Sequence, residues 1–428
     1  MSARSLLVVL YGRVIGQVGQ RSVFAEPEFT YDPEYVETGS TPLAIGLPIA
    51  DTTYRGRYVR AFLEGILPED PAIRQRWART LDVEPGDTVA ILSRMGWDCP
   101  GAVQFCLPDE FDELRLRANE TRPVDEEEIA QRLTALRTGT AISWTLPDEH
   151  WSLPGQQSKI ALLKTQAGWY ETRGSAATTH ILKPGIGRLH HQALVEHATM
   201  RAAHALGVEV AQTEFVRFGA GEPAVVIERY DRLLSDDGTV MRLHQEDFCS
   251  AGGRLPARKY EADGGLGLSG LALIISQNVG DRVGGMRALG DFAAFNYIAG
   301  APDGHSKNIS LMLLPGETRV APLYDLATSL PYEGRNPALR EVAVSIGGRR
   351  KFGQVLGKHW DRAAATLGIP RGDFRDRARY LAENFPDAFS DALSEVEGEE
   401  ASEVRSRSID AIARHAQNVV ARLGEPGV

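Results

Sequence analysis

The 428-residue sequence has few cysteines and no long apolar run, and both absences narrow its class. Its three cysteines, Cys99, Cys106 and Cys249, are too few for a disulfide scaffold and lack zinc-site spacing. No stretch approaches the ~20 apolar residues that a membrane-spanning helix requires. The run Leu6–Leu10 is too short for the hydrophobic region of a signal peptide. We therefore expect a soluble cytoplasmic protein with no membrane partner.

The sequence also lacks internal repeats, low-complexity tracts and histidine pairs spaced as metal ligands. Its adjacent histidines, His190 and His191, indicate a loop. A net charge of −10 argues against a protein that binds nucleic acid by itself. The exceptions are a compact basic turn at Gly347–Lys351 and an arginine-rich stretch at Arg371–Arg379, either of which is also typical of a solvated surface.

What the sequence does contain is a carboxylate and amide set suited to phosphoryl transfer. Asp303 and Asn308 lie five residues apart, and Asp325 follows 17 residues after Asn308. In protein kinases an aspartate and an asparagine at this spacing supply the base and a Mg²⁺ ligand, and a later aspartate supplies the second ligand. The apolar runs Ile309–Leu314 and Val320–Leu323 predict a β-hairpin that returns Asp325 to the end where Asn308 lies.

A lysine and a glutamate upstream occur in the order that a kinase requires. Thr179–Lys183 predicts a short strand that ends in Lys183, 120 residues before Asp303. A helix is expected over His191–Leu206, closed by Gly207, and it carries Glu196 as a candidate partner for Lys183. Taken singly, the lysine is equally typical of a solvated strand end and the glutamate of an exposed helix face.

The segment Ser152–Lys159 is a candidate phosphate loop before the apolar run Ile160–Leu163. It lacks both the G-x-G-x-x-G of ordinary protein kinases and the G-K-[ST] of a Walker A loop. Gly155 permits close approach of the backbone to a ligand, and Lys159 supplies positive charge. Ala224–Asp231 predicts a buried strand that runs into polar residues, which suits either an adenine-binding hinge or an ordinary strand end.

Together these segments resemble the HipA family of bacterial serine/threonine kinases, the toxins of type II toxin–antitoxin systems. The similarity covers nearly the whole chain and includes Lys259–Gly265 and an N-terminal module that starts near Leu6. It implies an α+β fold, with a strand-rich small lobe, a helical large lobe and an N-terminal α/β module. The implied domains are an N-terminal module (1–108), a charged linker and helix (109–139), a small lobe (140–232) and a large lobe (233–428).

The resemblance also implies roles for individual residues, with ATP and Mg²⁺ as cofactors. Asp303 would be the catalytic base, Asn308 and Asp325 the Mg²⁺ ligands, and Ser152 a site of autophosphorylation. The implied nucleotide-binding residues are Pro154, Gly155, Gln156, Gln157, Ser158, Lys159, Lys183, Glu228, Arg229, Tyr230, His305, Ser306, Lys307, Asn308, Tyr324 and Asp325. The position of Lys307 leaves its role open, and His305 is more often structural than a base.

The implied partners are a helix-turn-helix antitoxin and a protein substrate, with an aminoacyl-tRNA synthetase as the leading candidate. Operator DNA would be bound mainly through the antitoxin, with minor phosphate contacts from Arg349, Arg350 and Lys351. Two other functions stay open: a non-catalytic co-repressor that acts with an antitoxin, and a kinase of small molecules or lipids. Retention of Lys183, Asp303, Asn308 and Asp325 favours the catalytic interpretation.

Overall fold

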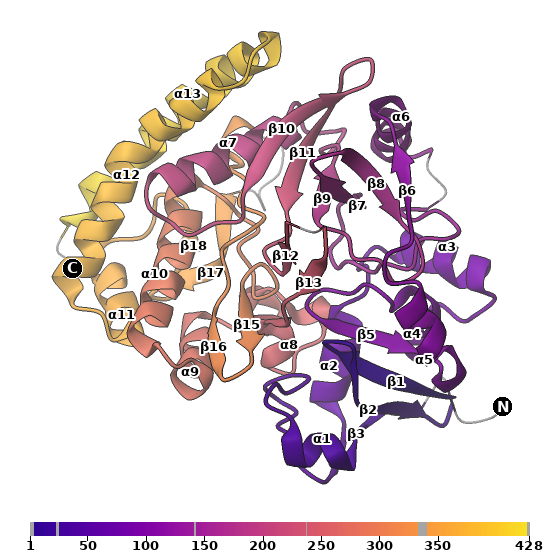
Figure 1. Cartoon of the computed structure of the whole chain (residues 1–428). Helices are drawn as coiled ribbons and strands as arrows, with labels where there is room; N and C mark the ends of the chain where they lie inside the picture. The colour runs from indigo at the N-terminus through magenta and orange to yellow at the C-terminus, as the bar shows by residue number, and fades with distance from the viewer. Residues whose placement is uncertain (1–3, 23–24, 141–142, 237, 333–339, 426–428) are drawn as a thin grey trace. The chain divides into compact units, whose positions relative to one another are not determined.

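The computed structural model describes residues 4–22, 25–140, 143–236, 238–332 and 340–425 (Figure 1). The chain forms two compact units, each assembled from three segments. Unit 1 contains Met1–Pro184, Arg217–Pro256 and Leu311–Thr318. Unit 2 contains Gly185–Val216, Ala257–Ser310 and Arg319–Val428. Within the described residues no helix is long and apolar enough to span a membrane.

An antiparallel five-stranded sheet forms the N-terminal part of unit 1. Its order is β4-β3-β2-β1-β5, from β4 (Thr53–Arg55), β3 (Glu28–Tyr31), β2 (Arg13–Gln20), β1 (Arg4–Leu10) and β5 (Val103–Cys106). The apolar run Leu6–Leu10 lies within β1. Tyr11 and Gly12 join β1 to β2 with φ of 54° and 75°. Two consecutive positive φ values match the two-residue turns whose twist suits a hairpin.

A second large sheet has six strands, in the order β10-β11-β9-β7-β8-β6. Its strands are β10 (Thr213–Phe218), β11 (Glu222–Glu228), β9 (His180–Lys183), β7 (Ile160–Thr165), β8 (Gly168–Thr172) and β6 (Thr121–Val124). The strand predicted at Thr179–Lys183 is confirmed as β9, and the one predicted within Ala224–Asp231 is present as β11, which ends at Glu228. The apolar run Ile160–Leu163 lies in β7. In the antiparallel pairing of β9 with β11, Lys183 faces Val225 and His180 faces Glu228.

The stretch 109–139, expected to be a charged linker and a helix, contains further regular structure before that helix. It contains the short helix α5 (Phe111–Leu116) and the strand β6, which pairs with β8 at the edge of the sheet. Pro123 lies within β6, and an edge strand accommodates a proline because one side of its backbone needs no partner. The helix that follows, α6 (Glu126–Arg137), is the expected one and begins with a capping box from Asp125 and Glu128.

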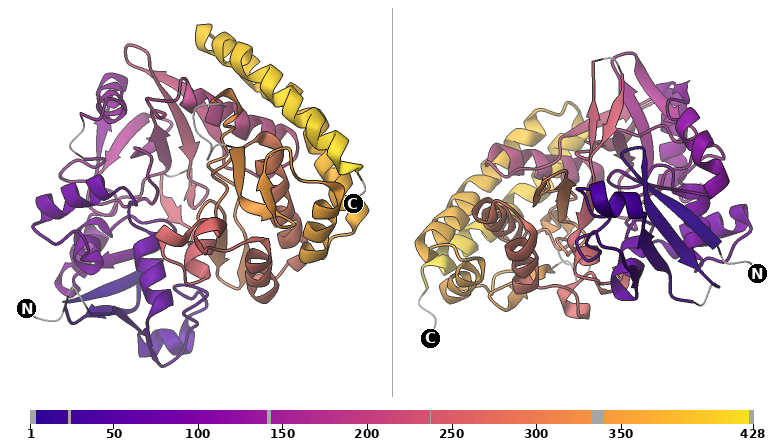
Figure 2. Two further views of the ribbon diagram at one scale, coloured as in Figure 1. Left: turned by 180° about the vertical axis from the view of Figure 1, so that it is seen from behind. Right: turned by 60° about the horizontal axis from the view of Figure 1, so that its bottom comes forward.

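Helices of unit 1 flank these sheets, and unit 2 is mostly helical (Figures 1 and 2). The remaining helices of unit 1 are α1 (Pro33–Thr38), α2 (Arg57–Gly65), α3 (Pro71–Leu81), α4 (Thr88–Met95) and α8 (Phe248–Ala251). Those of unit 2 are α7 (Gln192–Ala205), α9 (Leu268–Asn278), α10 (Arg282–Ala299), α11 (Gly357–Leu367), α12 (Arg371–Ser394) and α13 (Glu399–Leu423). The short hairpins are β12 (Arg232–Leu234) with β13 (Val240–Arg242), and β17 (Glu341–Ile346) with β18 (Arg349–Lys351).

Aromatic side chains fill the core of unit 2. Phe295 of α10 packs edge-on against Phe385 of α12, with ring centroids 5.4 Å apart. Tyr297 contacts Trp360 of α11 at 5.8 Å. Helix α12 packs against both α7 and α13. The helix expected over His191–Leu206 is confirmed as α7, with Gly207 at φ 74° just past its end.

Two aspartates and three arginines form a buried charge cluster inside unit 1. Asp98 accepts hydrogen bonds from Arg232 at 2.9 Å and from Arg242 at 3.2 Å, and Arg229 lies 3.4 Å from its second oxygen. Asp231 accepts two hydrogen bonds from Arg229, each 3.0 Å long. Both aspartates, Arg229 and Arg232 are at least 96% buried. Ion pairs this far from water must be fully matched to be tolerated.

The same cluster joins segments that are about 130 residues apart in the sequence. The carboxylate of Asp98 accepts hydrogen bonds from the backbone and the hydroxyl of Thr178, at 3.0 and 2.8 Å. The carboxylate of Asp231 accepts the backbone N–H of Gly101 at 2.6 Å, and Arg229 donates to the carbonyl of Cys99 at 3.0 Å. The loop that leads into β5 is therefore fixed to the strands of the second sheet.

Replacing Asp98 with asparagine should destabilise unit 1 strongly. Burial would raise the pKa of Asp98, but the guanidiniums of Arg232, Arg242 and Arg229 outweigh burial and lower the pKa to about 2. Loss of the charge leaves buried arginines uncompensated, which costs about 3–5 kcal/mol. We expect the first thermal transition to fall by roughly 10 °C in differential scanning calorimetry.

Glu34→Gln is the matched control for Asp98→Asn, because Glu34 forms a solvent-exposed pair with Arg13 and should leave the transition almost unchanged. An Asp98→Asn protein that melted with the wild type would show that the cluster does not stabilise the unit.

Glu246 is a second buried acid of unit 1, on β14 (Gln245–Asp247), and its neighbours lower its pKa little. Its carboxyl accepts hydrogen bonds from the backbone of Ile45 at 2.8 Å and the hydroxyl of Ser250 at 2.9 Å. Burial outweighs these bonds and raises the pKa of Glu246 to about 8. The folded protein therefore binds a proton at neutral pH that the unfolded chain releases near pH 4.5.

The stability contributed by Glu246 should be complete below about pH 4.5 and should be lost as pH rises through about 8. Glu246→Gln imitates the protonated acid and should remove that loss. Urea unfolding at pH 6 and pH 9 should show a smaller decrease in midpoint for the variant than for the wild type. Equal decreases in both proteins would contradict the assignment.

Candidate active site

The loop that carries Asp303 begins where α10 ends. Gly300 closes the helix in the left-handed conformation, at φ 66°, and the chain then turns back along the helix. Gly304 lies against the buried amide of Asn296, and a Cβ at Gly304 would lie 2.5 Å from that side chain. A glycine is therefore required beside Asp303 because the loop packs so tightly on α10.

The predicted catalytic base, Asp303, and the two predicted Mg²⁺ ligands lie together within unit 2. The amide nitrogen of Asn308 donates to the backbone carbonyl of Asp303 at 2.8 Å and to the carboxylate of Asp325 at 3.2 Å. The predicted hairpin is present as β15 (Ser310–Leu314) and β16 (Glu317–Val320), in the sheet order β14-β15-β16. Its second strand starts earlier than the expected Val320–Leu323, because the turn is confined to the two residues between the strands.

Asp325 has a backbone conformation that few non-glycine residues adopt. Its φ is 60°, in the left-handed region. Such conformations cost free energy and concentrate at functional sites, where the surrounding structure holds them. The neighbouring Tyr324 helps to hold this backbone conformation. Its hydroxyl donates to the backbone carbonyl of Lys307 at 2.7 Å and lies 2.7 Å from the side-chain hydroxyl of Ser310.

Tyr260 contacts the predicted catalytic base directly. Its hydroxyl donates to the Asp303 carboxylate, and its ring meets that of His305 edge-on at 4.8 Å. Ser306 secures the same tract, because its hydroxyl donates to the carbonyl of Lys259 at 2.9 Å. Tyr260 belongs to the tract Lys259–Gly265, for which the sequence indicated similarity to the family but no role for this tyrosine. Its distance of 43 residues from Asp303 left no local signal to find the contact.

Glu261 anchors this tract to β17. Its carboxylate accepts hydrogen bonds from the backbone and the hydroxyl of Ser345, at 2.6 and 2.9 Å. His305, Ser306 and Lys307 are each at least 95% buried, and the imidazole of His305 lies 3.7 Å from the Asp303 carboxylate. Ser306 therefore supports the loop, whereas the Asp303 side chain is 54% exposed and accessible to a substrate.

The candidate phosphate loop lies in unit 1 and is held at two points. Gly155 has a φ of 103° and accepts a hydrogen bond from the backbone of Glu69 at 3.0 Å. Lys159 donates to the carbonyl of Pro154 at 2.8 Å, and its ammonium lies 4.4 Å from the ring centre of Trp144. The loop thus folds around its own lysine, which is 95% buried.

Ser152, the predicted site of autophosphorylation, is completely buried in unit 1. Its hydroxyl donates to the backbone carbonyl of Ile66 at 2.8 Å, and its backbone N–H donates to the backbone carbonyl of Asp98 at 2.9 Å. A phosphoryl group has no room at this position, so modification requires the segment to open.

The predicted hinge begins at Glu228, the last residue of β11, and continues with Arg229 and Tyr230. The backbone N–H of Arg229 donates to Thr179 at 2.9 Å, and its side chain belongs to the buried charge cluster. Arg229 therefore has a structural role that the sequence did not indicate. Tyr230 donates its hydroxyl to Gln245.

Lys183 and Glu196 are both buried, each inside its own unit. Lys183 ends β9 and is 7% exposed. Glu196 lies on α7, is 1% exposed and accepts a hydrogen bond from Gln192 at 3.1 Å. The alternatives of a solvated lysine and an exposed helix carboxylate are therefore wrong. The pairing of Lys183 with Glu196 stays a prediction.

The fold is the expected α+β, protein-kinase-like fold. A solved complex of the Shewanella oneidensis MR-1 toxin–antitoxin system, with HipA, HipB and its operator DNA, contains a chain that superposes with a TM-score of 0.79. The match covers 98% of this chain and 96% of that chain at 24% sequence identity.

The chain belongs to the HipA family. Residues 6–106 match the HipA N-terminal domain, and residues 151–389 match the HipA-like C-terminal domain. A putative kinase, Y4mE, from Sinorhizobium fredii is 32% identical, over 92% of this chain and 93% of its own. The serine/threonine-protein kinase toxin HipA from Shewanella oneidensis is 27% identical, over 90% of this chain and 89% of its own.

Proposed function

We propose that this chain is an ATP- and Mg²⁺-dependent serine/threonine protein kinase that acts as the toxin of a toxin–antitoxin pair. The observation that carries the proposal is the contact of Asn308 with both Asp303 and Asp325. A similar protein named as a serine/threonine-protein kinase toxin supports it. The activity would take place in the cytoplasm, where ATP and the proposed substrate are present.

Asp303 would act as the general base. Its half-exposed carboxylate would accept the proton of a serine or threonine hydroxyl as that oxygen attacks the γ-phosphorus of ATP and ADP leaves. The hydrogen bond from Tyr260 would hold the carboxylate in one orientation before the substrate arrives.

Asn308 and Asp325 fit the ligand set of Mg²⁺, which prefers oxygen atoms. The carboxylate of Asp325 supplies one ligand, and the amide oxygen of Asn308 supplies another once the amide turns its oxygen toward the ion. When bound, Mg²⁺ neutralises charge on the phosphates of ATP. The tight packing of the loop on α10 would keep both ligands in place.

The remaining nucleotide contacts are proposed from the family resemblance. Lys183 and the loop Pro154–Lys159 would bind phosphate oxygens, and Glu228–Tyr230 would contact the adenine side. Since Lys159 donates to the carbonyl of Pro154, ATP binding would require the lysine to exchange that partner for a phosphate.

The proposed partners are a HipB-like helix-turn-helix antitoxin and an aminoacyl-tRNA synthetase as substrate. The similar Shewanella structure, a complex of HipA with HipB and operator DNA, supports the antitoxin. Arg349 and Lys351 are exposed on β18, two residues apart and thus on one face of the strand. Arg350 lies 3.9 Å from Glu341, so Arg349 and Lys351 are the better candidates for minor DNA phosphate contacts.

Asp303→Asn and Asp325→Asn should each abolish phosphoryl transfer without unfolding the chain. Loss of a general base lowers rates by ~10²–10⁴-fold, and loss of a metal ligand should do comparable damage. Transfer of labelled γ-phosphate to the chain itself and to lysate proteins measures both effects, and melting temperatures should stay within a few degrees of the wild type.

Tyr260→Phe is the graded control, because it removes only the hydroxyl that contacts Asp303. It should slow transfer less than Asp303→Asn. Wild-type transfer rates in either aspartate variant would show that the site is assigned incorrectly. A wild-type chain that binds an antitoxin but transfers no phosphate would favour a non-catalytic co-repressor. Transfer of phosphate only to small molecules or lipids would favour a kinase of those substrates.

Incubation with Mg·ATP should place phosphate on Ser152, slowly, because the buried segment must open first. The group carries about −1.5 to −2 charges, too many to return to an apolar site, so the modified segment should stay displaced and ATP binding should weaken. Mass spectrometry of the peptide that spans Trp151–Lys159 should detect the modification, and the Asp303→Asn protein should lack it.

Ser152→Asp should lose ATP affinity in a thermal-shift titration with Mg·ATP, whereas Ser152→Ala should retain it. A Ser152→Asp protein that binds ATP and transfers phosphate at the wild-type rate would rule out an inhibitory role for the modification.

A further inference from the structure

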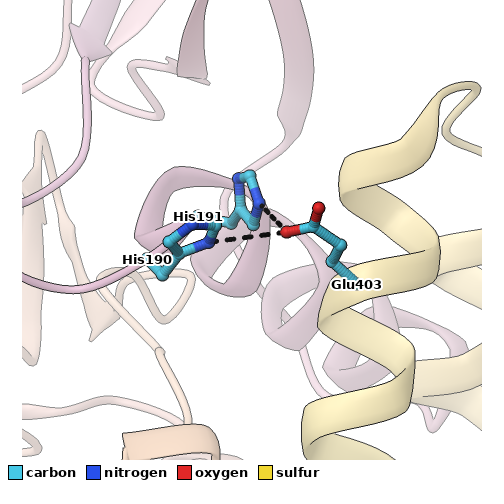
Figure 3. A group of neighbouring side chains, drawn as sticks. All are labelled: His190, His191 and Glu403. Carbon is cyan, nitrogen blue, oxygen red and sulfur yellow. Dashed lines mark hydrogen bonds and ion pairs between the residues drawn. The ribbon is translucent and has the colours of Figure 1, made fainter.

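A group of two imidazoles and one carboxylate lies on unit 2, and none of its members is among the residues assigned to phosphoryl transfer (Figure 3). His190 and His191 precede α7, and Glu403 lies in the first turns of α13. Nε2 of His191 is 3.0 Å from one oxygen of Glu403, and Nδ1 of His190 is 3.8 Å from the same oxygen. All three ligand atoms lie within 4.8 Å of one another.

We propose that His190, His191 and Glu403 bind a transition-metal ion of the Zn²⁺ type. Zinc bound by imidazole and carboxylate at about 2.0–2.2 Å in a tetrahedron places neighbouring ligand atoms about 3.3–3.5 Å apart. The two observed separations lie on either side of that spacing, so small side-chain rotations complete the site. Three protein ligands leave the fourth position to water, as in other two-histidine, one-carboxylate zinc sites.

The backbone at this position is arranged so that neighbouring side chains converge. Consecutive residues in a strand point to opposite faces, and in a helix they point about 100° apart. His191 instead adopts a left-handed conformation, with φ 55° and ψ 31°, and the two rings stand perpendicular with centroids 4.0 Å apart. The carbonyl of His190 accepts a hydrogen bond from Tyr332 at 2.7 Å, which fixes the turn.

An ordinary surface hydrogen bond explains only part of this arrangement. One histidine suffices to pair with Glu403, and exposed pairs of this kind contribute little to stability. The second imidazole beside the same oxygen is the feature that a metal site explains. Side chains of His190 and Glu403 are each 53% exposed, so an ion can enter from solvent.

The ligand chemistry separates this site from the proposed Mg²⁺ site. Imidazole nitrogen favours zinc, copper and nickel, whereas Mg²⁺ prefers carboxylate and carbonyl oxygen. An ion here would link residues 212 positions apart and tie the start of α7 to α13. Helix α7 also carries Glu196, so the ion would hold that helix without taking part in phosphoryl transfer.

The test is calorimetric titration of ZnCl₂ into the full, tag-free chain. The expected result is one site per chain, retained in excess Mg²⁺, with a rise in melting temperature of at least ~2 °C on saturation. His191→Ala and Glu403→Gln should each lose the site and the shift. The metal-free variants should melt close to the wild type because all three residues lie at the surface.

His204→Ala is the matched control, since His204 is an exposed histidine on the same helix outside the group, and it should bind as the wild type does. Asp303→Asn should also bind normally, so failure of the kinase assignment and failure of this one are distinguishable. Absence of Zn²⁺ binding, or equal binding by the wild type and both ligand variants, would overturn the proposal and indicate an adventitious ion only.

Discussion

The buried charge cluster around Asp98 is the constraint on which unit 1 depends. In this cluster buried aspartates pair with buried arginines that water cannot reach. Each of these side chains also forms hydrogen bonds with backbone groups. Because an unmatched charge there is so costly, the loop before β5 and the segment after β11 can adopt few other arrangements. The same constraint fixes Arg229, and with it the strand end from which the proposed adenine contacts begin.

In unit 2 a different principle positions the reactive groups. Short loops hold Asp303, Asn308 and Asp325 because glycine, asparagine and tyrosine side chains occupy the space around them. The left-handed conformation of Asp325 shows that the local backbone is held against its own preference. The side chain of Asp303 is 54% exposed, as its proposed role of general base requires.

The candidate metal group and the proposed catalytic cluster share a structural device. In both, a non-glycine residue with positive φ turns a side chain toward partners that ordinary helix or strand geometry would not bring together. In the first case the partner comes from a helix more than two hundred residues later, and in the second from the far end of a hairpin. In both groups, therefore, a local turn orients one side chain and long-range packing brings its partner residue to it.

The family followed from the resemblance of whole motifs in the sequence. Local spacing and periodicity predicted several strands, the helix after Lys183, and the grouping of Asp303, Asn308 and Asp325. Within 109–139, where a charged linker and a helix were expected, the density of charge concealed an edge strand that pairs with β8. Only the tertiary structure decided that Arg229 is structural, that Ser152 is buried, that Tyr260 contacts Asp303 and that Glu403 meets two histidines. These facts depend on contacts between residues 43 to 212 positions apart, which leave no periodic trace in the sequence.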